Sequence, residues 1–216
     1  FIFKGEIHHK DSRGNDSLIQ AGGVQWMTAG RGIVHSEGIS KAFHEKGGDL
    51  EIIQLWINLP AVHKMVQPRY QGFQADEIPH FISEDGKARL NVISGNYADL
   101  KGAVDSLTGI TAYTIDLKAG GKINITEPVH RSAILYQLWG TAEVNGVSTG
   151  DTKLVVFQQD GDQIELVAQT DSTLLYLSGD PINEEVTQYG PFVMNTQTEV
   201  LEAMRDYQMG KMGILI

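Results

Sequence analysis

Cysteine is absent from the chain of 216 residues, so disulfide bonds and thiolate metal ligands are excluded. The absence fits a reducing compartment, although exported proteins can also lack cysteine, and no secretion signal is visible. We therefore expect a cytoplasmic protein. No apolar run approaches the ~20 residues of a transmembrane helix, so insertion into a membrane is not expected.

Positive charge is scarce as well. The sequence has 17 Lys and Arg against 27 Asp and Glu, which gives a net charge of −10 at pH 7. Such a surface repels phosphate backbones and no basic cluster offsets it, so direct binding of nucleic acid is not expected. The 41% hydrophobic content is enough for a core, and the low charged content of 20% argues against disorder.

The length allows one large or two small domains. Short apolar strands separated by turn residues recur along the whole chain, a pattern typical of a sandwich or barrel. Asn145 and Gly146 separate two short runs and predict a tight hairpin. Other strands are expected at 1–4, 17–20, 50–59, 88–95, 110–117, 132–140, 153–157, 163–168 and 172–179.

Three further expectations concern the ends of the chain and its middle. Phe1 already lies in a strand-like run, so we expect that the natural chain begins upstream of it. The strand at 50–59 has the clearest alternation and Pro60 ends it, while 38–48 is expected to be a loop.

One helix is expected after Thr196, which forms a capping-box pattern with Glu199. An apolar stripe at helical spacing predicts the face that packs on the core: Val200, Leu201, Met204 and Tyr207.

His35 and Glu37 are the candidate functional residues. They are two apart on a predicted strand, so their side chains should project from the same face. A nitrogen and an oxygen ligand together suit a borderline divalent metal such as iron, nickel, manganese or zinc. A His-x-Glu pair is also common on an ordinary polar strand face, and the pair alone does not decide between the two.

The residues around this pair resemble the signature of the pirin family, a branch of the cupin superfamily. The resemblance lies in the run QWMTAG at 25–30, the glycine that follows at 32, and the His35-x-Glu37 pair. A second match covers GDPI at 179–182 and YGPFVMNT at 189–196. The resemblance implies an all-β fold of two tandem cupin-type β-barrels, a bicupin, with a C-terminal α-helix. Mixed turn residues at 101–108 favour a boundary near residue 100, and no His-x-His or His-x-Glu follows it. We therefore expect an N-terminal cupin domain with the metal site at 1–100, and a C-terminal cupin domain with the helix and no metal site at 101–216.

In pirins the His and Glu of this motif are two of four protein ligands to one metal. The resemblance therefore implies that His35 and Glu37 are ligands, and that two histidines of a His-Pro-His segment lie upstream of residue 1. His8 and His9 are adjacent on a strand, so at most one of them could join the pair; the alternative is that both are exposed beside a turn. His130 stands alone in the second half, and a single imidazole does not hold a divalent ion tightly.

The function that the resemblance implies is that of a metal-dependent dioxygenase of the quercetin 2,3-dioxygenase type. A flavonol-like substrate and dioxygen would bind beside the metal, with Glu37 as ligand and possible general base. Fe(II) is the expected metal, with Ni, Mn, Cu or Zn as alternatives. A second hypothesis is an iron-dependent regulator that binds a transcription factor or enzyme partner without turnover. A third is a cupin that has lost its metal.

Overall fold

The structure is a computed structural model that describes residues 1–215. Strands hold 44% of the residues and helices only 12%, which confirms the all-β prediction. Two compact units are present: unit 1 contains residues 1–75 and the chain from 182 onward, and unit 2 contains residues 76–181. The division into domains at 1–100 and 101–216 stays a prediction. Among the described residues, no helix is long and apolar enough to cross a membrane.

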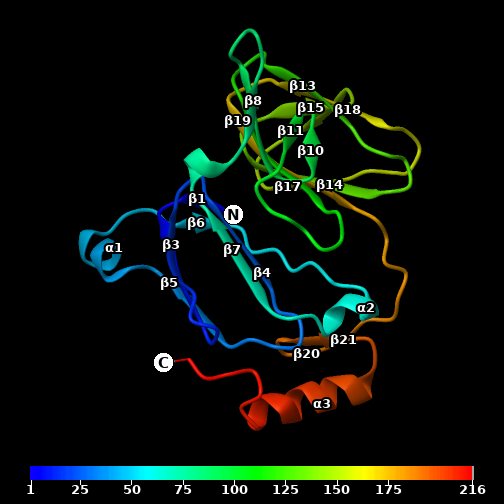
Figure 1. Ribbon diagram of the computed structural model, residues 1–216. Helices are drawn as coiled ribbons and strands as arrows, with labels where there is room; N and C mark the ends of the chain where they lie inside the picture. Colours follow the sequence, from blue (N-terminus) through cyan, green and yellow to red (C-terminus); the bar gives the residue numbers. More distant parts are fainter. Residues whose placement is uncertain (216) are drawn as a thin grey trace. The chain divides into compact units, whose positions relative to one another are not determined.

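Unit 1 begins with small antiparallel sheets (Figure 1). One of them has the strand order β3-β2-β5. Two others pair β1 with β6 and β4 with β7. The strands have these bounds: β1 Ile2–Lys4, β2 Glu6–Asp11, β3 Asp16–Gln20, β4 Val24–Thr28, β5 His35–Gly38, β6 Glu51–Ile52 and β7 Arg69–Phe73.

The segment 50–59 does not form the long strand that its alternation predicts. Only Glu51–Ile52 is a strand, paired with β1, and the hydrogen bonds of Ile53 with Phe1 extend it by one residue. A strand needs a hydrogen-bonded neighbour along its length, and alternation alone does not supply one. The predicted loop at 38–48 instead contains a short helix, α1 (Lys41–Lys46), which Ser40 caps through the backbone NH of Phe43. A second short helix, α2, covers Ala61–Lys64.

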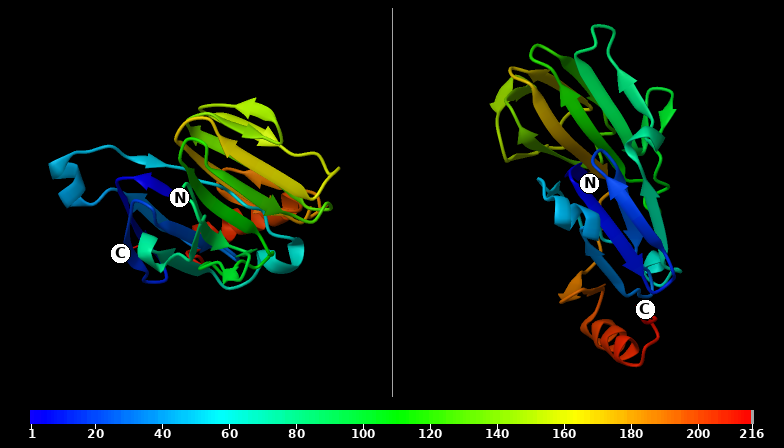
Figure 2. Two further views of the ribbon diagram at one scale, coloured as in Figure 1. Left: turned by 90° about the horizontal axis from the view of Figure 1, so that it is seen from above. Right: turned by 90° about the vertical axis from the view of Figure 1, so that its left-hand side faces the viewer.

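The C-terminal part of the chain returns to unit 1. Strands β20 (Thr187–Tyr189) and β21 (Phe192–Met194) form a hairpin, and the helix α3 (Gln197–Gln208) follows and packs beside it (Figure 2). The predicted C-terminal helix is thus present. Its apolar stripe was interpreted wrongly in part, because Val200 is buried but Leu201 and Tyr207 are exposed.

Loss of the α3 cap has a defined cost. The Thr196 side chain accepts a hydrogen bond from the Glu199 backbone NH, and the Glu199 carboxylate accepts one from the Thr196 backbone NH. We expect Thr196→Ala to lower the free energy of unfolding of unit 1 by about 1 kcal/mol, the usual cost of losing such a cap. Urea unfolding measures it. Thr198→Ala, on the same exposed turn, removes the same atoms without touching the cap; an equal loss in both variants would contradict the assignment.

Unit 2 is built from two larger antiparallel sheets. The first has the order β17-β14-β19-β12-β9-β8, and the second has the order β13-β18-β15-β16. The β15–β16 turn is the predicted Asn145-Gly146 hairpin, with positive φ at both residues. The elements are η1 Ala75–Glu77, which crosses the boundary between the units, and β8 His80–Ile82, β9 Ala88–Ser94, β10 Asn96–Tyr97, β11 Leu100–Lys101, β12 Thr111–Leu117, β13 Lys122–Thr126, β14 Ser132–Trp139, β15 Ala142–Val144, β16 Val147–Thr149, β17 Lys153–Val156, β18 Gln163–Ala168 and β19 Ser172–Gly179.

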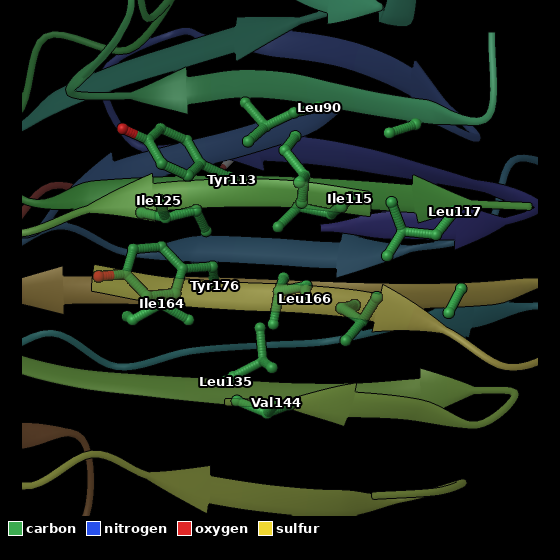
Figure 3. Close-up of a cluster of buried hydrophobic side chains, with 14 of the residues drawn as sticks. Leu90, Tyr113, Ile115, Leu117, Ile125, Leu135, Val144, Ile164, Leu166 and Tyr176 are labelled. Carbon is green, nitrogen blue, oxygen red and sulfur yellow. The ribbon is translucent and has the colours of Figure 1, made fainter. Parts of the chain in front are cut away.

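The core of unit 2 is filled by side chains from both of its sheets. Leu90 and Ile115 come from the first sheet, and Ile125 and Leu166 come from the second; all are buried (Figure 3). Tyr113 and Tyr176 stack within this core, with ring centroids 5.6 Å apart. Strands β13 and β18 alternate buried apolar and exposed polar residues, whereas β19 buries five residues in a row.

Candidate metal centre

Strand β5, which carries both candidate residues, is held at its start by two contacts. The Ser12 hydroxyl accepts a hydrogen bond from the Val34 backbone NH at 3.1 Å and donates to the Met212 carbonyl at 2.7 Å. In the turn before it, the Val66 carbonyl accepts from the Arg31 backbone NH at 3.0 Å. The signature glycines thus belong to a turn that fixes where β5 begins.

Gly30 is required in this turn for a physical reason. Its φ is 52°, and a Cβ atom on it would lie 2.2 Å from the Val66 carbonyl oxygen. Gly190 has nearly the same φ, 54°, but open space around it. Gly30→Ala should therefore lower the free energy of unfolding by about 1–3 kcal/mol more than Gly190→Ala, because overpacking adds to the shared backbone strain. Urea unfolding measures both variants, and equal losses of free energy in the two would show that the turn at Gly30 can shift to accommodate the Cβ atom.

His35 and Glu37 do project together, as predicted for residues two apart on a strand. The Nδ1 atom of His35 lies 3.8 Å from Glu37 Oε1, and the two side chains are 33% and 31% exposed. Strand β5 pairs with β2 so that His9 stands directly opposite Glu37. The Nδ1 atom of His9 lies 3.5 Å from Glu37 Oε1. One possible ligand atom from each of His9, His35 and Glu37 falls within 4.8 Å of the others.

The sequence left two alternatives for His8 and His9, and the alternative in which both are exposed beside a turn is wrong for His9. Its side chain is not exposed at all, because it shares the inward face of β2 with Ile7 and Asp11. His8 points the other way and pairs with Asp16 at 2.5 Å. The rule that only one of the two could approach Glu37 therefore selects His9. The period-two pattern Ile7, His9, Asp11 was the available signal.

Carboxylates flank the buried imidazole on both sides. His9 Nε2 lies 3.2 Å from Asp11 Oδ2, opposite the contact with Glu37. Burial lowers the pKa of His9, but the nearby carboxylates of Glu37 and Asp11 outweigh burial and raise it above its usual value. The nearby His9 imidazole lowers the pKa of Glu37, against burial, so this carboxylate is ionised at neutral pH.

These residues fit a divalent metal. Imidazole nitrogens with one carboxylate form the donor set of iron, nickel, manganese and zinc sites. Glu37 is ionised, as ligation requires. His35 and Glu37 keep part of their surface open to solvent. Elsewhere in the chain, His130 is exposed and lies 3.1 Å from Asp180.

Comparisons with known proteins establish the family of the chain. The family described as "Pirin" matches residues 1–57, and the "Pirin C-terminal cupin domain" matches residues 112–213. A Pseudomonas aeruginosa protein named "Putative quercetin 2,3-dioxygenase" is 36% identical over 97% of this chain and 73% of its own length. The chain belongs to the pirin family.

Other pirin relatives support the assignment. Pirin-1 of Arabidopsis thaliana is 36% identical over 99% of this chain and 74% of its own. The crystal structure of a quercetin 2,3-dioxygenase from Acinetobacter baumannii superposes with a TM-score of 0.94 at 37% identity, over all of this chain and 75% of that one. The predicted bicupin fold with a C-terminal helix is thereby confirmed.

One solved relative contains a metal. The bacterial pirin YhhW of Escherichia coli was crystallised in complex with nickel(II). It shares the fold with a TM-score of 0.66 over 84% of this chain and 71% of its own, at 23% identity. At this identity the likeness shows the shared fold, and the experiments below test which metal this chain binds.

Proposed function

We propose that the protein is a metal-dependent dioxygenase of the quercetin 2,3-dioxygenase type, acting on a flavonol-like substrate with dioxygen. The observation that carries the proposal is the convergence of His35 and Glu37 on the open side of β5, at the positions of the pirin signature. The names of the Pseudomonas and Acinetobacter relatives support the reaction class. Fold alone would not, because one fold hosts many activities.

In this proposal His35 and Glu37 are metal ligands, and two histidines encoded upstream of residue 1 complete the set. Fe(II) is the expected metal, with Ni, Mn, Cu or Zn as alternatives that the same donors accept. A divalent metal held by these residues would bring substrate and dioxygen together and would stabilise negative charge on the substrate oxygen. Glu37 is ionised, so its carboxylate can accept the proton of a flavonol hydroxyl at Oε1 or Oε2.

The test uses the full-length gene product with its natural upstream sequence. After loading with Fe(II), Ni(II) or Mn(II), quercetin loss is followed by absorbance and dioxygen uptake by an electrode, and bound metal is counted by mass spectrometry. We expect about one metal per chain and turnover that stops when a chelator removes it. Stoichiometric metal without quercetin loss would overturn the dioxygenase proposal and favour the regulator hypothesis. No bound metal would favour the inert cupin.

A further inference from the structure

The proposed function gives no role to the imidazole of His9, which lies beside the proposed ligand Glu37. His9 is fully buried, yet its two ring nitrogens face the carboxylates of Asp11 and Glu37. We propose that His9 is a positioning residue that holds the Glu37 carboxylate in place for the metal and is not itself a ligand. The proposal rests on Glu37 being a ligand, as proposed above.

The backbone register places the two side chains together. His9 on β2 and Glu37 on β5 are directly opposite each other in the antiparallel ladder, a position in which facing side chains interact across the strands. The contact of 3.5 Å between Nδ1 and Oε1 therefore needs no long reach from either side chain. Nδ1 is buried and makes no hydrogen bond with good geometry, and the Glu37 oxygen at 3.5 Å is the carboxylate atom that it faces.

The Nε2 side of the His9 imidazole is held by the carboxylate of Asp11. Asp11 Oδ2 lies 3.2 Å from His9 Nε2. The same carboxylate accepts hydrogen bonds from Asn15 Nδ2 at 2.8 Å, from the Arg13 backbone NH at 2.9 Å and from the Asn15 backbone NH at 3.1 Å. Asp11 is thus tied to the β2–β3 turn, and its position fixes that of the ring.

A stacked ring fixes the plane of the imidazole. Tyr70 lies parallel to His9, with centroids 4.2 Å apart and 12° between the planes, and the Tyr70 hydroxyl is hydrogen-bonded to Ser17 at 2.5 Å. The ring of His9 is therefore held at Nε2 and across one face. Only the Nδ1 direction is left for function, and it points to Glu37.

A ligand role suits the geometry of His9 less well than positioning does. A ligating nitrogen must present a lone pair to the metal, whereas Nε2 is engaged by Asp11 and Nδ1 faces a carboxylate that can accept its proton. His35 and Glu37 are each about a third exposed, and His9 is sealed behind them. Partners that orient a metal-bound carboxylate are typically worth about 10–100-fold in metal affinity.

The experiment compares metal affinity and ligand count in the full-length gene product. His9→Phe keeps a ring against Tyr70 but removes both nitrogens, and His9→Asn restores a donor near the Nδ1 position. Asp11→Asn leaves the ring in place and loosens its anchor, so it tests the proposal even if His9→Phe fails to fold. His8→Gln, one residue away on the opposite face, is the matched control. Co(II) affinity is measured by chelator competition, and the number of nitrogens bound to Cu(II) by electron paramagnetic resonance.

We expect His9→Phe to weaken Co(II) binding by about 10–100-fold, with His9→Asn recovering part of the loss. Asp11→Asn should weaken binding in the same direction, and His8→Gln should leave it unchanged. The nitrogen count should equal that of the wild type in all variants. One bound nitrogen fewer in His9→Phe would show that His9 is a ligand. Unchanged Co(II) affinity in both His9→Phe and Asp11→Asn would show that His9 and Asp11 serve only packing. Either result overturns the positioning proposal and leaves the proposed function standing. A wild type that binds no metal overturns both proposals.

Discussion

Glu37→Gln is expected to weaken metal binding by the full-length gene product more than about 100-fold, since it removes a proposed ligand, whereas the loss of an orienting partner costs about 10–100-fold. Glutamine keeps the length of the side chain but loses the negative charge and one acceptor oxygen. Quercetin turnover should fall with metal occupancy. Chelator competition with Co(II) and metal analysis measure the loss.

Two variants make this result specific. His35→Gln should weaken binding in the same way, because its imidazole lies 3.8 Å from Glu37 on the same strand face. Glu45→Gln removes the same charge from the exposed helix α1, where Glu45 lies 3.8 Å from Lys41, and should leave affinity unchanged. Wild-type affinity in Glu37→Gln, or an equal loss in Glu45→Gln, would refute the assignment of Glu37 as a ligand.

Arg131→Met is expected to lower the free energy of unfolding of unit 2 by about 3–5 kcal/mol, the usual cost of breaking a buried ion pair from one side. Arg131 Nη1 lies 2.8 Å from Glu127 Oε1, and the side chains are only 14% and 8% exposed. The other Glu127 oxygen accepts the hydroxyl of the buried Tyr176 at 3.0 Å. Without the guanidinium, the Glu127 charge stays in this core uncompensated. The guanidinium also donates to Thr111 at 3.1 Å, a contact that would be lost too.

The chain offers a matched control for this pair. Lys118 Nζ lies at the same distance, 2.8 Å, from Asp171 Oδ2, but these side chains are 69% and 64% exposed. Solvent screens such a pair, so Lys118→Met should change unfolding little. Urea unfolding of both variants, followed by the fluorescence of Trp139 in unit 2, measures the difference. Similar losses would mean that burial does not set the strength of these pairs.

Local signals predicted a large share of the fold because they act through neighbouring residues. The Asn145-Gly146 turn needs positive φ at both positions, and the Thr196 cap needs only Glu199. The strand at 50–59 was wrong beyond Ile52 because pairing depends on a neighbour far away in the sequence. Alternation shows that a segment can face a core, and it does not show which strand will pair with it.

The candidate metal centre was predictable from the sequence only for the residues that lie on one strand. His35 and Glu37 come from one strand, so spacing alone placed them on one face. His9 comes from another strand, and its position depends on the register of β2 against β5. A histidine among charged neighbours is usually exposed. His9 is buried because it lies on the inward face of β2, where the carboxylates of Asp11 and Glu37 face its two ring nitrogens.

The make-up of unit 1 from both ends of the chain has a consequence for synthesis. The Met212 carbonyl accepts a hydrogen bond from the Ser12 hydroxyl, so the support of β5 requires a residue that is translated after all of unit 2. Unit 2 is one continuous segment, residues 76–181, and every strand it needs has emerged before α3 exists. The usual order, in which the N-terminal part folds first, is therefore expected to be reversed here: the start of β5 gains this support only after all of unit 2 has been translated.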